Sequence, residues 1–167
     1  MRINYRPEID GLRAIAVISV IFYHANVTIF DQKLLKGGFI GVDIFFVISG
    51  YLITSIILKE LTTNGFFSFT NFYKRRIRRI LPPLFVVMFL CFPIAWTQLG
   101  PANFIDFSKS ILYSIGFSSN FYFWDMGQQY SAQSSLLKPF LHTWSLSVEE
   151  QYYIIFPIIL FIIFRYL

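Results

Sequence analysis

Long apolar runs separated by short polar stretches dominate the chain. The first run, residues 11–30, is followed by a polar turn at 31–36 and a second apolar run at 37–58. Two further runs lie at 80–97 and 144–164. At about 1.5 Å per residue, each is long enough for a helix that crosses a hydrocarbon layer about 30 Å thick. The pattern therefore predicts four membrane-spanning helices.

Residues 103–124 follow this pattern less clearly. The segment is apolar in places but contains Asp106 and Lys109 together with several hydroxyl side chains, namely Ser108, Ser110, Ser114, Ser118 and Ser119. Such a polar segment is a poor lipid-facing span, so a re-entrant or interfacial segment is one interpretation and a fifth span is the other. The sequence predicts an all-α, polytopic transmembrane helix bundle with four or five membrane helices.

Composition supports a membrane protein. Hydrophobic residues make up 56% of the 167 residues and charged residues only 14%, and the mean hydropathy is +0.59. An ordinary soluble domain does not have this composition. The net charge of +5 could suggest nucleic acid, but the cations lie beside apolar runs, so we expect the lipid bilayer as partner and no nucleic acid.

The cations also predict an orientation. If the amino terminus is cytoplasmic, four cations lie outside and the other ten of the 14 lie inside; the outer four are Lys33, Lys36, Lys109 and Lys138. If residues 103–124 also span the membrane, Lys138 moves inside and Arg165 moves outside. The count of ten cations inside and four outside is then unchanged. The positive-inside rule thus places the amino terminus in the cytoplasm without choosing between four and five spans. The length of the first run and its internal His24 favour a retained span over a cleaved signal peptide.

Glycines and prolines predict local features. Gly37 and Gly41 form a small-xxx-small pair that would let another helix approach closely. Pro82 and Pro83 fall in the first turn of the helix expected at 80–97, where proline is tolerated. Pro93 is expected to bend its far end.

Arg13 and His24 are the ionisable residues of the first run. They are separated by three helical turns and so lie on nearly the same face, roughly 16 Å apart. An imidazole at membrane depth faces a protein interior or a water-filled path, where it can accept a proton from a hydroxyl group. The alternative is a histidine hydrogen-bonded within the bundle, with Arg13 extended toward the headgroups.

Three carboxylates accompany the later runs. Asp43 lies within the second run and needs a partner, for which a neighbouring imidazole is suitable; the alternative is a solvated aspartate near the outer boundary. Glu149 and Glu150 lie near the start of the last run and project about 100° apart, so at most one is expected to face the bundle centre. Ser147 with Glu150 also fits a capping box at a helix start.

A basic stretch precedes the third run. Arg75 and Arg78, and likewise Arg76 and Arg79, are three residues apart on an expected helix. They could be a topology signal that contacts anionic lipid, or a clamp for phosphates, because guanidinium groups match phosphate oxygens. The two distant histidines and the single cysteine give no metal-ligand spacing, so we expect no metal.

Four blocks of sequence, taken together, resemble the acyltransferase-3 family of bacterial integral membrane O-acyltransferases. They are DGLRAIAVISVIFYHA at 10–25, GGFIGVDIFFVISGYLIT at 37–54, FYKRRIRRILPPL at 72–84 and HTWSLSVEEQYY at 142–153. The resemblance implies a fold of roughly ten membrane helices, of which this chain is the amino-terminal portion. It also implies transfer of an acyl group, usually acetyl, from cytoplasmic acyl-CoA to a hydroxyl of an acceptor such as lipopolysaccharide, peptidoglycan or exopolysaccharide.

The resemblance also implies roles for particular residues. The Arg and His of the family's first helix correspond to Arg13 and His24, and its Arg-x-x-Arg motif to Arg75–Arg78 or Arg76–Arg79. In the family the segment with the WSLSVEEQ-like block begins on the outer side, which favours four spans here.

Together these expectations describe residues 1–167 as part of one acyltransferase domain in the bacterial inner membrane. His24 is expected to act as general base, with Asp43 or Glu149 orienting its imidazole. The arginines of the basic stretch are expected to hold the phosphates of acetyl-CoA, which is a donor substrate and not a bound cofactor. The acceptor is expected to be a cell-surface polysaccharide or lipopolysaccharide. One alternative is an inactive truncated fragment; the other is part of a proton-coupled transporter that uses the same ionisable residues.

Overall fold

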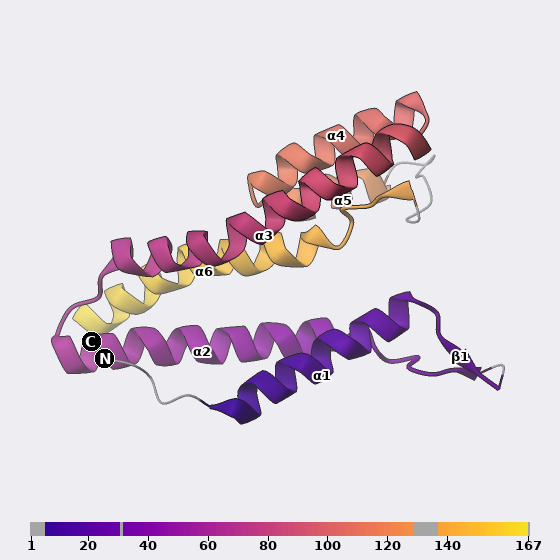
Figure 1. Ribbon diagram of the computed structural model, residues 1–167. Helices are drawn as coiled ribbons and strands as arrows, with labels where there is room; N and C mark the ends of the chain where they lie inside the picture. Colours follow the sequence, from indigo (N-terminus) through magenta and orange to yellow (C-terminus); the bar gives the residue numbers. More distant parts are fainter. Residues whose placement is uncertain (1–5, 31, 129–136, 167) are drawn as a thin grey trace. The chain divides into compact units, whose positions relative to one another are not determined.

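The computed structural model describes residues 6–30, 32–128 and 137–166 (Figure 1). The elements are α1 (Pro7–His24), β1 (Thr28–Ile29), β2 (Gln32–Lys33), α2 (Ile40–Asn64), α3 (Phe69–Gln98), α4 (Pro101–Ile115), α5 (Ser119–Gln128) and α6 (Thr143–Tyr166). The expected all-α helix bundle is confirmed, with one two-residue strand pair as an addition. The chain divides into two compact units, Met1–Phe67 and Ser68–Leu167, each described by itself.

Within the described residues, three helices are long and apolar enough to cross a membrane. They are α2, α3 and α6. The first helix, α1, has 18 residues and carries Glu8, Asp10 and Arg13 near its start. The number of membrane crossings therefore stays a prediction.

The first helix does not match the expected run at 11–30. It begins at Pro7, whose missing N–H costs nothing at the first helical position, and the acidic Glu8 and Asp10 occupy its first turn. It ends at His24, and Asn26 then takes a left-handed backbone conformation at φ +49°. The six residues after His24 leave the helix and enter the short hairpin of β1 and β2.

In the first unit, α1 and α2 pack closely through glycine. A Cβ atom added to Gly41 would overlap the carbonyl oxygen of Ala16 and lie 2.8 Å from the Val20 Cγ2 atom. A Cβ atom on Gly38 would lie 2.7 Å from the Cβ atom of Tyr23. Gly41 thus makes the predicted close approach, but its partner is Gly38 and not Gly37, because an atom added at Gly37 would meet only the Ile40 Cδ1 atom, at 3.7 Å.

The second unit begins with α3, which is longer than the run expected at 80–97. Ser68 caps it by accepting a hydrogen bond from the Asn71 backbone N–H at 3.4 Å. The helix therefore includes the whole basic stretch, and Pro82 and Pro83 lie in its interior. The expectation that they occupy a first helical turn is wrong, because the cap at Ser68, twelve residues before residue 80, starts the helix earlier.

Residues 103–124 form a helical hairpin. A turn with Phe117 at φ +49° separates α4 from α5. The rings of Tyr113 and Tyr122 stack at 4.6 Å between centroids, and the Tyr122 hydroxyl donates to the Asp106 carbonyl oxygen at 3.2 Å. The segment is thus not one continuous helix. Residues 129–136, between α5 and α6, lie outside the described residues.

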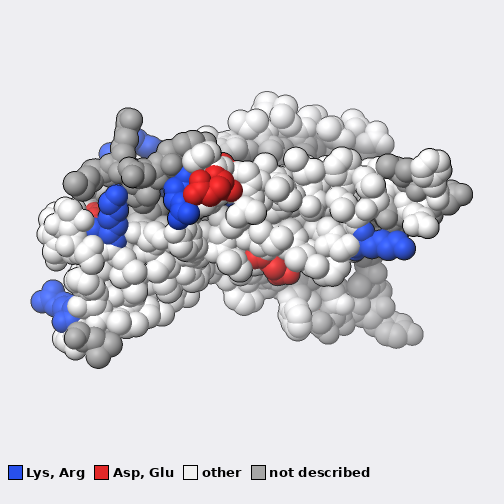
Figure 2. Space-filling view, turned by 90° about the horizontal axis from the view of Figure 1, so that it is seen from below, with Lys and Arg blue, Asp and Glu red and all other residues white. Residues whose placement is uncertain are grey.

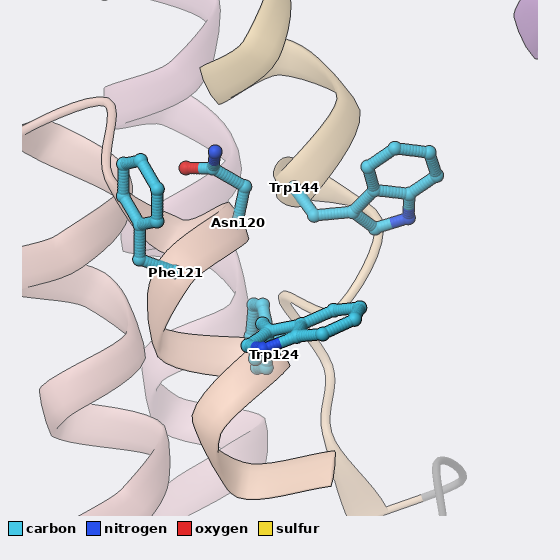
Figure 3. Close-up of a pocket in the computed structure, with 5 residues that line it drawn as sticks. Asn120, Phe121, Trp124 and Trp144 are labelled. Carbon is cyan, nitrogen blue, oxygen red and sulfur yellow. The ribbon is translucent and has the colours of Figure 1, made fainter. Parts of the chain in front are cut away.

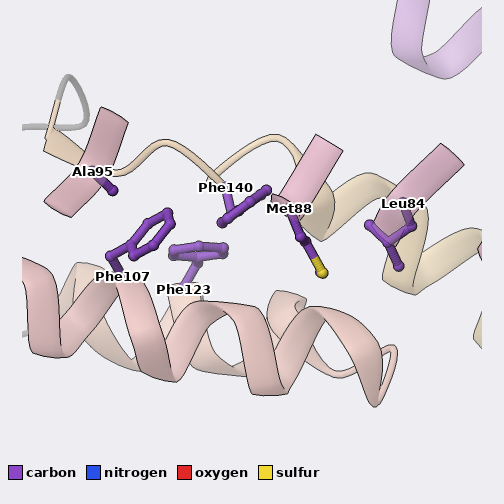
Figure 4. Close-up of a cluster of buried hydrophobic side chains, with 6 residues drawn as sticks. All are labelled: Leu84, Met88, Ala95, Phe107, Phe123 and Phe140. Carbon is purple, nitrogen blue, oxygen red and sulfur yellow. The ribbon is translucent and has the colours of Figure 1, made fainter. Parts of the chain in front are cut away.

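The core of the second unit lies where α3, α4, α5 and the segment before α6 meet (Figure 4). It consists of Leu84, Met88, Ala95, Phe107, Phe123 and Phe140. Phe107 and Phe140 stack at 5.4 Å between ring centroids, and both are almost fully buried. This core fixes the α4–α5 hairpin against the apolar half of α3.

Much of the apolar surface remains exposed. On the face seen in Figure 2, charged side chains occupy a few separate places and the rest is uncharged. Only 17–28% of the apolar windows of α2, α3 and α6 is buried within the structure. Such surface suits contact with lipid or with further helices.

Candidate functional site

Hydroxyl groups link α4, α5 and α6 in the interior of the second unit. The Ser114 and Thr143 hydroxyls lie 2.8 Å apart, and the Ser119 and Ser147 hydroxyls are also 2.8 Å apart. Thr143 joins the pairs by donating to the Ser119 Oγ atom at 3.0 Å. All four residues are at most 3% exposed, which explains why a buried segment carries so many serines.

Ser147 therefore does not cap a helix. The helix α6 begins at Thr143, so Ser147 and Glu150 lie inside it, and the capping-box interpretation is wrong. One turn further along, the side-chain amide of Gln151 donates to the Asn120 Oδ1 atom at 2.9 Å and to the Phe117 carbonyl oxygen at 2.8 Å. These bonds continue the polar contact between α5 and α6.

The helices α3 and α6 lie side by side and run antiparallel (Figure 1). The rings of Phe69 and Phe161 meet at 5.6 Å between centroids, and the Tyr73 hydroxyl donates to the Ile154 carbonyl oxygen at 3.0 Å. Residues further along α3 thus contact residues closer to the start of α6. The basic stretch of α3 consequently lies beside the middle of α6.

At this level Arg76 faces α6. Its guanidinium carbon lies 4.8 Å from the centroid of the Tyr153 ring and 5.6 Å from that of Phe72. Glu149 in turn accepts a hydrogen bond from the Tyr153 hydroxyl. Arg76, Tyr153 and Glu149 form a group that we call the Arg76 cluster.

The two glutamates differ in their surroundings. Glu150 is 7% exposed, and its Oε1 atom has no hydrogen-bond partner within the described residues. Glu149 is only partly buried. The more deeply buried of the pair is therefore Glu150, as their 100° separation on a helix allows.

The other arginines of the basic stretch are oriented differently. Arg75, Arg78 and Arg79 are exposed, whereas Arg76 is partly buried. Within the described residues, none of the exposed three forms an ion pair. They can therefore contact an anionic ligand from solvent.

In the first unit, Arg13 contacts the neighbouring helix. Its guanidinium carbon lies 5.9 Å from the centroid of the Phe45 ring on α2, and an Nη1 atom lies 3.6 Å from an Asp10 carboxylate oxygen. Its side chain is only 17% exposed. Arg13 is thus held against α2 rather than extended into solvent.

His24 and Asp43 are both exposed. His24 is the last residue of α1, and the edge of its ring meets the Tyr23 ring at 5.3 Å between centroids. Asp43 lies in the first turn of α2, where the helix dipole favours a carboxylate. No hydrogen bond or ion pair joins these two described residues, so the structure does not pair them.

An aromatic pocket lies beside the start of α6, and its described lining includes none of the predicted site residues (Figure 3). It has a volume of about 410 Å³ and is lined by Asn120, Phe121, Phe123, Trp124 and Trp144. Figure 3 shows the two indole rings on separate elements, Trp124 on α5 and Trp144 at the start of α6.

Sequence reasoning missed several of the residues that build these contacts. Tyr153 follows Glu149 by four positions and so shares its helix face, a signal that could have been used. Gln151 and the hydroxyl groups on α6 gave no such signal, because their partners lie on other helices.

The family of the chain follows from comparison with known proteins. Residues 6–167 match the model of the family described as "Acyltransferase domain". The chain belongs to this family, and its long apolar helices identify it as a membrane protein. No solved structure matches it.

Curated relatives agree with this family. The chain is 43% identical over 159 residues to a protein of Staphylococcus aureus (strain MSSA476) named "Putative O-acetyltransferase SAS0844", an alignment that covers 95% of this chain and 25% of the relative. It is 38% identical over 165 residues to "O-acetyltransferase OatA" of Staphylococcus aureus (strain NCTC 8325 / PS 47), covering 98% of this chain and 26% of the relative. The chain thus spans about a quarter of the length of these relatives.

Proposed function

We propose that the chain is part of a membrane-bound O-acyltransferase that moves an acetyl group from cytoplasmic acyl-CoA to a hydroxyl of a cell-surface polysaccharide or lipopolysaccharide. The observation that carries this proposal is the family match over residues 6–167. The relatives named as O-acetyltransferases favour acetyl as the group and an oxygen as its acceptor.

The exposed arginines of α3 supply a binding surface for the donor. Arg75, Arg78 and Arg79 are exposed on one helix, so either Arg-x-x-Arg pair places at least one arginine on this surface. Guanidinium groups form paired hydrogen bonds with phosphate oxygens, of which acyl-CoA carries several. These arginines hold the phosphates and so place the thioester for transfer.

His24 acts as the base in the reaction. Its imidazole removes the proton from the acceptor hydroxyl, and the hydroxyl oxygen attacks the thioester carbonyl carbon. The carbon–sulfur bond breaks, and the proton passes from the imidazole to the departing sulfur. A carboxylate, Asp43 or Glu149, orients the imidazole, and Arg13 lies three turns away on the same helix.

The antiparallel arrangement of α3 and α6 supports a topology for this enzyme. Two membrane-spanning helices are antiparallel when the segment that connects them starts and ends on the same side of the membrane. The α4–α5 hairpin has this property, which favours a non-crossing segment at 103–124. The amino terminus then lies in the cytoplasm of a bacterium, and the cations of α3 lie on the donor side of the inner membrane.

The test is alkali-labile acetate on purified surface polysaccharide. We expect acetate in cells that carry the full-length gene and none in cells that lack it or that carry His24→Ala. His142→Ala is the matched control and retains acetate, with equal amounts of each protein in the membrane. Acetate that does not depend on the gene would refute the function, and an active His24→Ala variant would refute the role of His24.

A further inference from the structure

The helices α1 and α2 lie side by side and run antiparallel (Figure 1). Two contacts through glycine define their register. A Cβ atom added to Gly38 would lie 2.7 Å from the Tyr23 Cβ atom, and one added to Gly41 would overlap the Ala16 carbonyl oxygen. Because helix residues three or four apart share a face, this register brings the next turn of α2 to the level of Arg13.

Phe45 occupies that next turn of α2. It follows Gly41 by four residues, and its ring centroid lies 5.9 Å from the guanidinium carbon of Arg13. A cation at this distance from an aromatic face is attracted to it. One further contact lies beyond it, where the Arg6 Nη1 atom donates to the Tyr51 hydroxyl at 2.7 Å. The contact of Arg13 with Phe45 therefore has other α1–α2 contacts on both sides, which fix its geometry.

Polar groups restrain the Arg13 guanidinium only weakly. Its Nη1 atom lies 3.6 Å from a carboxylate oxygen of Asp10, whose side chain is 50% exposed. Ion pairs of exposed groups contribute little in water. The Nε atom of Arg13 is buried and has no hydrogen-bond partner within the described residues. Among those residues, the ring of Phe45 is thus the main restraint on a long side chain that otherwise has many rotamers.

We propose that Phe45 is a positioning residue for acyl transfer, and that its ring holds the Arg13 guanidinium where the reaction requires it. This inference rests on the proposed function, in which Arg13 and His24 lie on the same helix of the enzyme. Phe45 acts through Arg13. What the position requires is an aromatic face, because cation–π attraction comes from the ring and not from the volume of the side chain.

The experiment compares Phe45→Leu with Phe45→Tyr in the purified full-length protein, with acetyl-CoA as donor and surface polysaccharide as acceptor. Leucine keeps an apolar side chain but has no ring, whereas tyrosine keeps the ring. We expect Phe45→Leu to lower kcat/KM for acetyl-CoA about tenfold, because a guanidinium that samples several rotamers is less often in place. Phe45→Tyr is expected to stay within about twofold of the wild type.

The matched control is Phe22→Leu on α1. Phe22 lies about 200° around the helix from Val20, whose Cγ2 atom faces Gly41, so the substitution falls on the side of α1 away from α2. We expect its kcat/KM within about twofold of the wild type.

Asp10→Asn removes the weaker restraint and is expected to lower kcat/KM less than Phe45→Leu does. The melting temperature and the amount of folded protein are measured for every variant. Rates are expressed per folded protein, so that a loss of stability is not counted as a loss of catalysis.

The outcomes distinguish this inference from the proposed function. A wild-type protein without acetyl-CoA-dependent transfer refutes the proposed function and, with it, this inference. An active wild type with an unimpaired Phe45→Leu variant refutes the inference alone. Equal losses in Phe45→Leu and Phe45→Tyr also refute it, because the aromatic face would then be irrelevant. A greater loss in Asp10→Asn than in Phe45→Leu refutes it as well, because the carboxylate would then hold Arg13.

Discussion

The two units of the chain solve helix packing in different ways. In the first unit, Gly38 and Gly41 bring the backbone of α2 against α1, so that even a methyl group would overlap α1. In the second unit, α4, α5 and α6 are joined by buried hydroxyl and amide groups, among them Ser119 and Ser147. Close backbone contact joins α1 and α2 in one unit, and side-chain hydrogen bonds join α4, α5 and α6 in the other.

This difference teaches which kind of substitution each unit tolerates. Glycine packing depends on the absence of volume, and an added methyl group must displace a helix backbone. In a buried hydroxyl pair, each side chain is the hydrogen-bond partner of the other. Removing one side chain therefore costs the other a buried hydrogen bond. The first unit is therefore expected to be sensitive to size and the second to polarity.

The largest effect is expected for Gly41→Ala. The new Cβ atom would overlap the Ala16 carbonyl oxygen, so α1 and α2 must separate. We expect a loss of on the order of 3 kcal/mol in stability, measured as thermal unfolding of the full-length protein in detergent. Gly11→Ala is the matched control, because nothing lies within 4 Å of the added atom. Equal melting temperatures for the two variants would contradict close glycine packing.

A smaller effect is expected for Ser147→Ala in the second unit. The substitution removes the partner of the Ser119 hydroxyl and of the Ser119 backbone N–H. We expect a destabilisation of about 1–3 kcal/mol, because these buried groups lose a hydrogen bond. Ser145→Ala, two residues earlier on the same helix, removes only a bond to the His142 carbonyl oxygen and should cost less. A Ser147→Ala variant as stable as Ser145→Ala would show that the hydroxyl cluster contributes little.

The smallest effect concerns Tyr122 and appears only at alkaline pH. Burial, and secondly the charge of Asp106, raises the pKa of Tyr122 to about 12 from its ordinary 10.0. The folded state thus favours the protonated phenol, and its contribution to stability is complete below pH 10.0 and is lost as pH rises toward about 12.

The measurement is the melting temperature as a function of pH for wild type and Tyr122→Phe. We expect the wild type to lose stability faster than the variant above the ordinary pKa of tyrosine, and the two curves to run parallel below it. Tyr166→Phe serves as control, because Tyr166 is 79% exposed. Parallel curves over the whole alkaline range would contradict a raised pKa at Tyr122.

Much of the fold could be predicted from the pattern of apolar residues. The helices at the second, third and last runs exist, because long apolar stretches have few alternatives in a membrane. Their ends were less predictable. Ser68 caps α3, which therefore begins well before its apolar part. The left-handed backbone of Asn26 follows the end of α1, which stops before the end of the apolar run at 11–30. Caps and turns depend on single residues, and the average hydrophobicity of a run does not reveal them.

The candidate site was only partly predictable. Spacing could place Glu149 and Glu150 on different faces of a helix, and the structure buries Glu150 more deeply. Spacing could not choose between Arg75–Arg78 and Arg76–Arg79, since both pairs have the same separation. The structure adds that Arg76 contacts Tyr153, and this contact depends on the register between α3 and α6. The predicted roles of His24, Arg13 and Asp43 stay predictions.

The sequence by itself determined that this is a helical membrane protein with an acyltransferase resemblance, because hydrophobic run length and local motifs are properties of neighbouring residues. The tertiary structure decided which glycine meets α1, which serines pair across α4, α5 and α6, and which arginine faces α6. Those contacts join residues far apart in the chain, and their partners are fixed only when helices pack in one register.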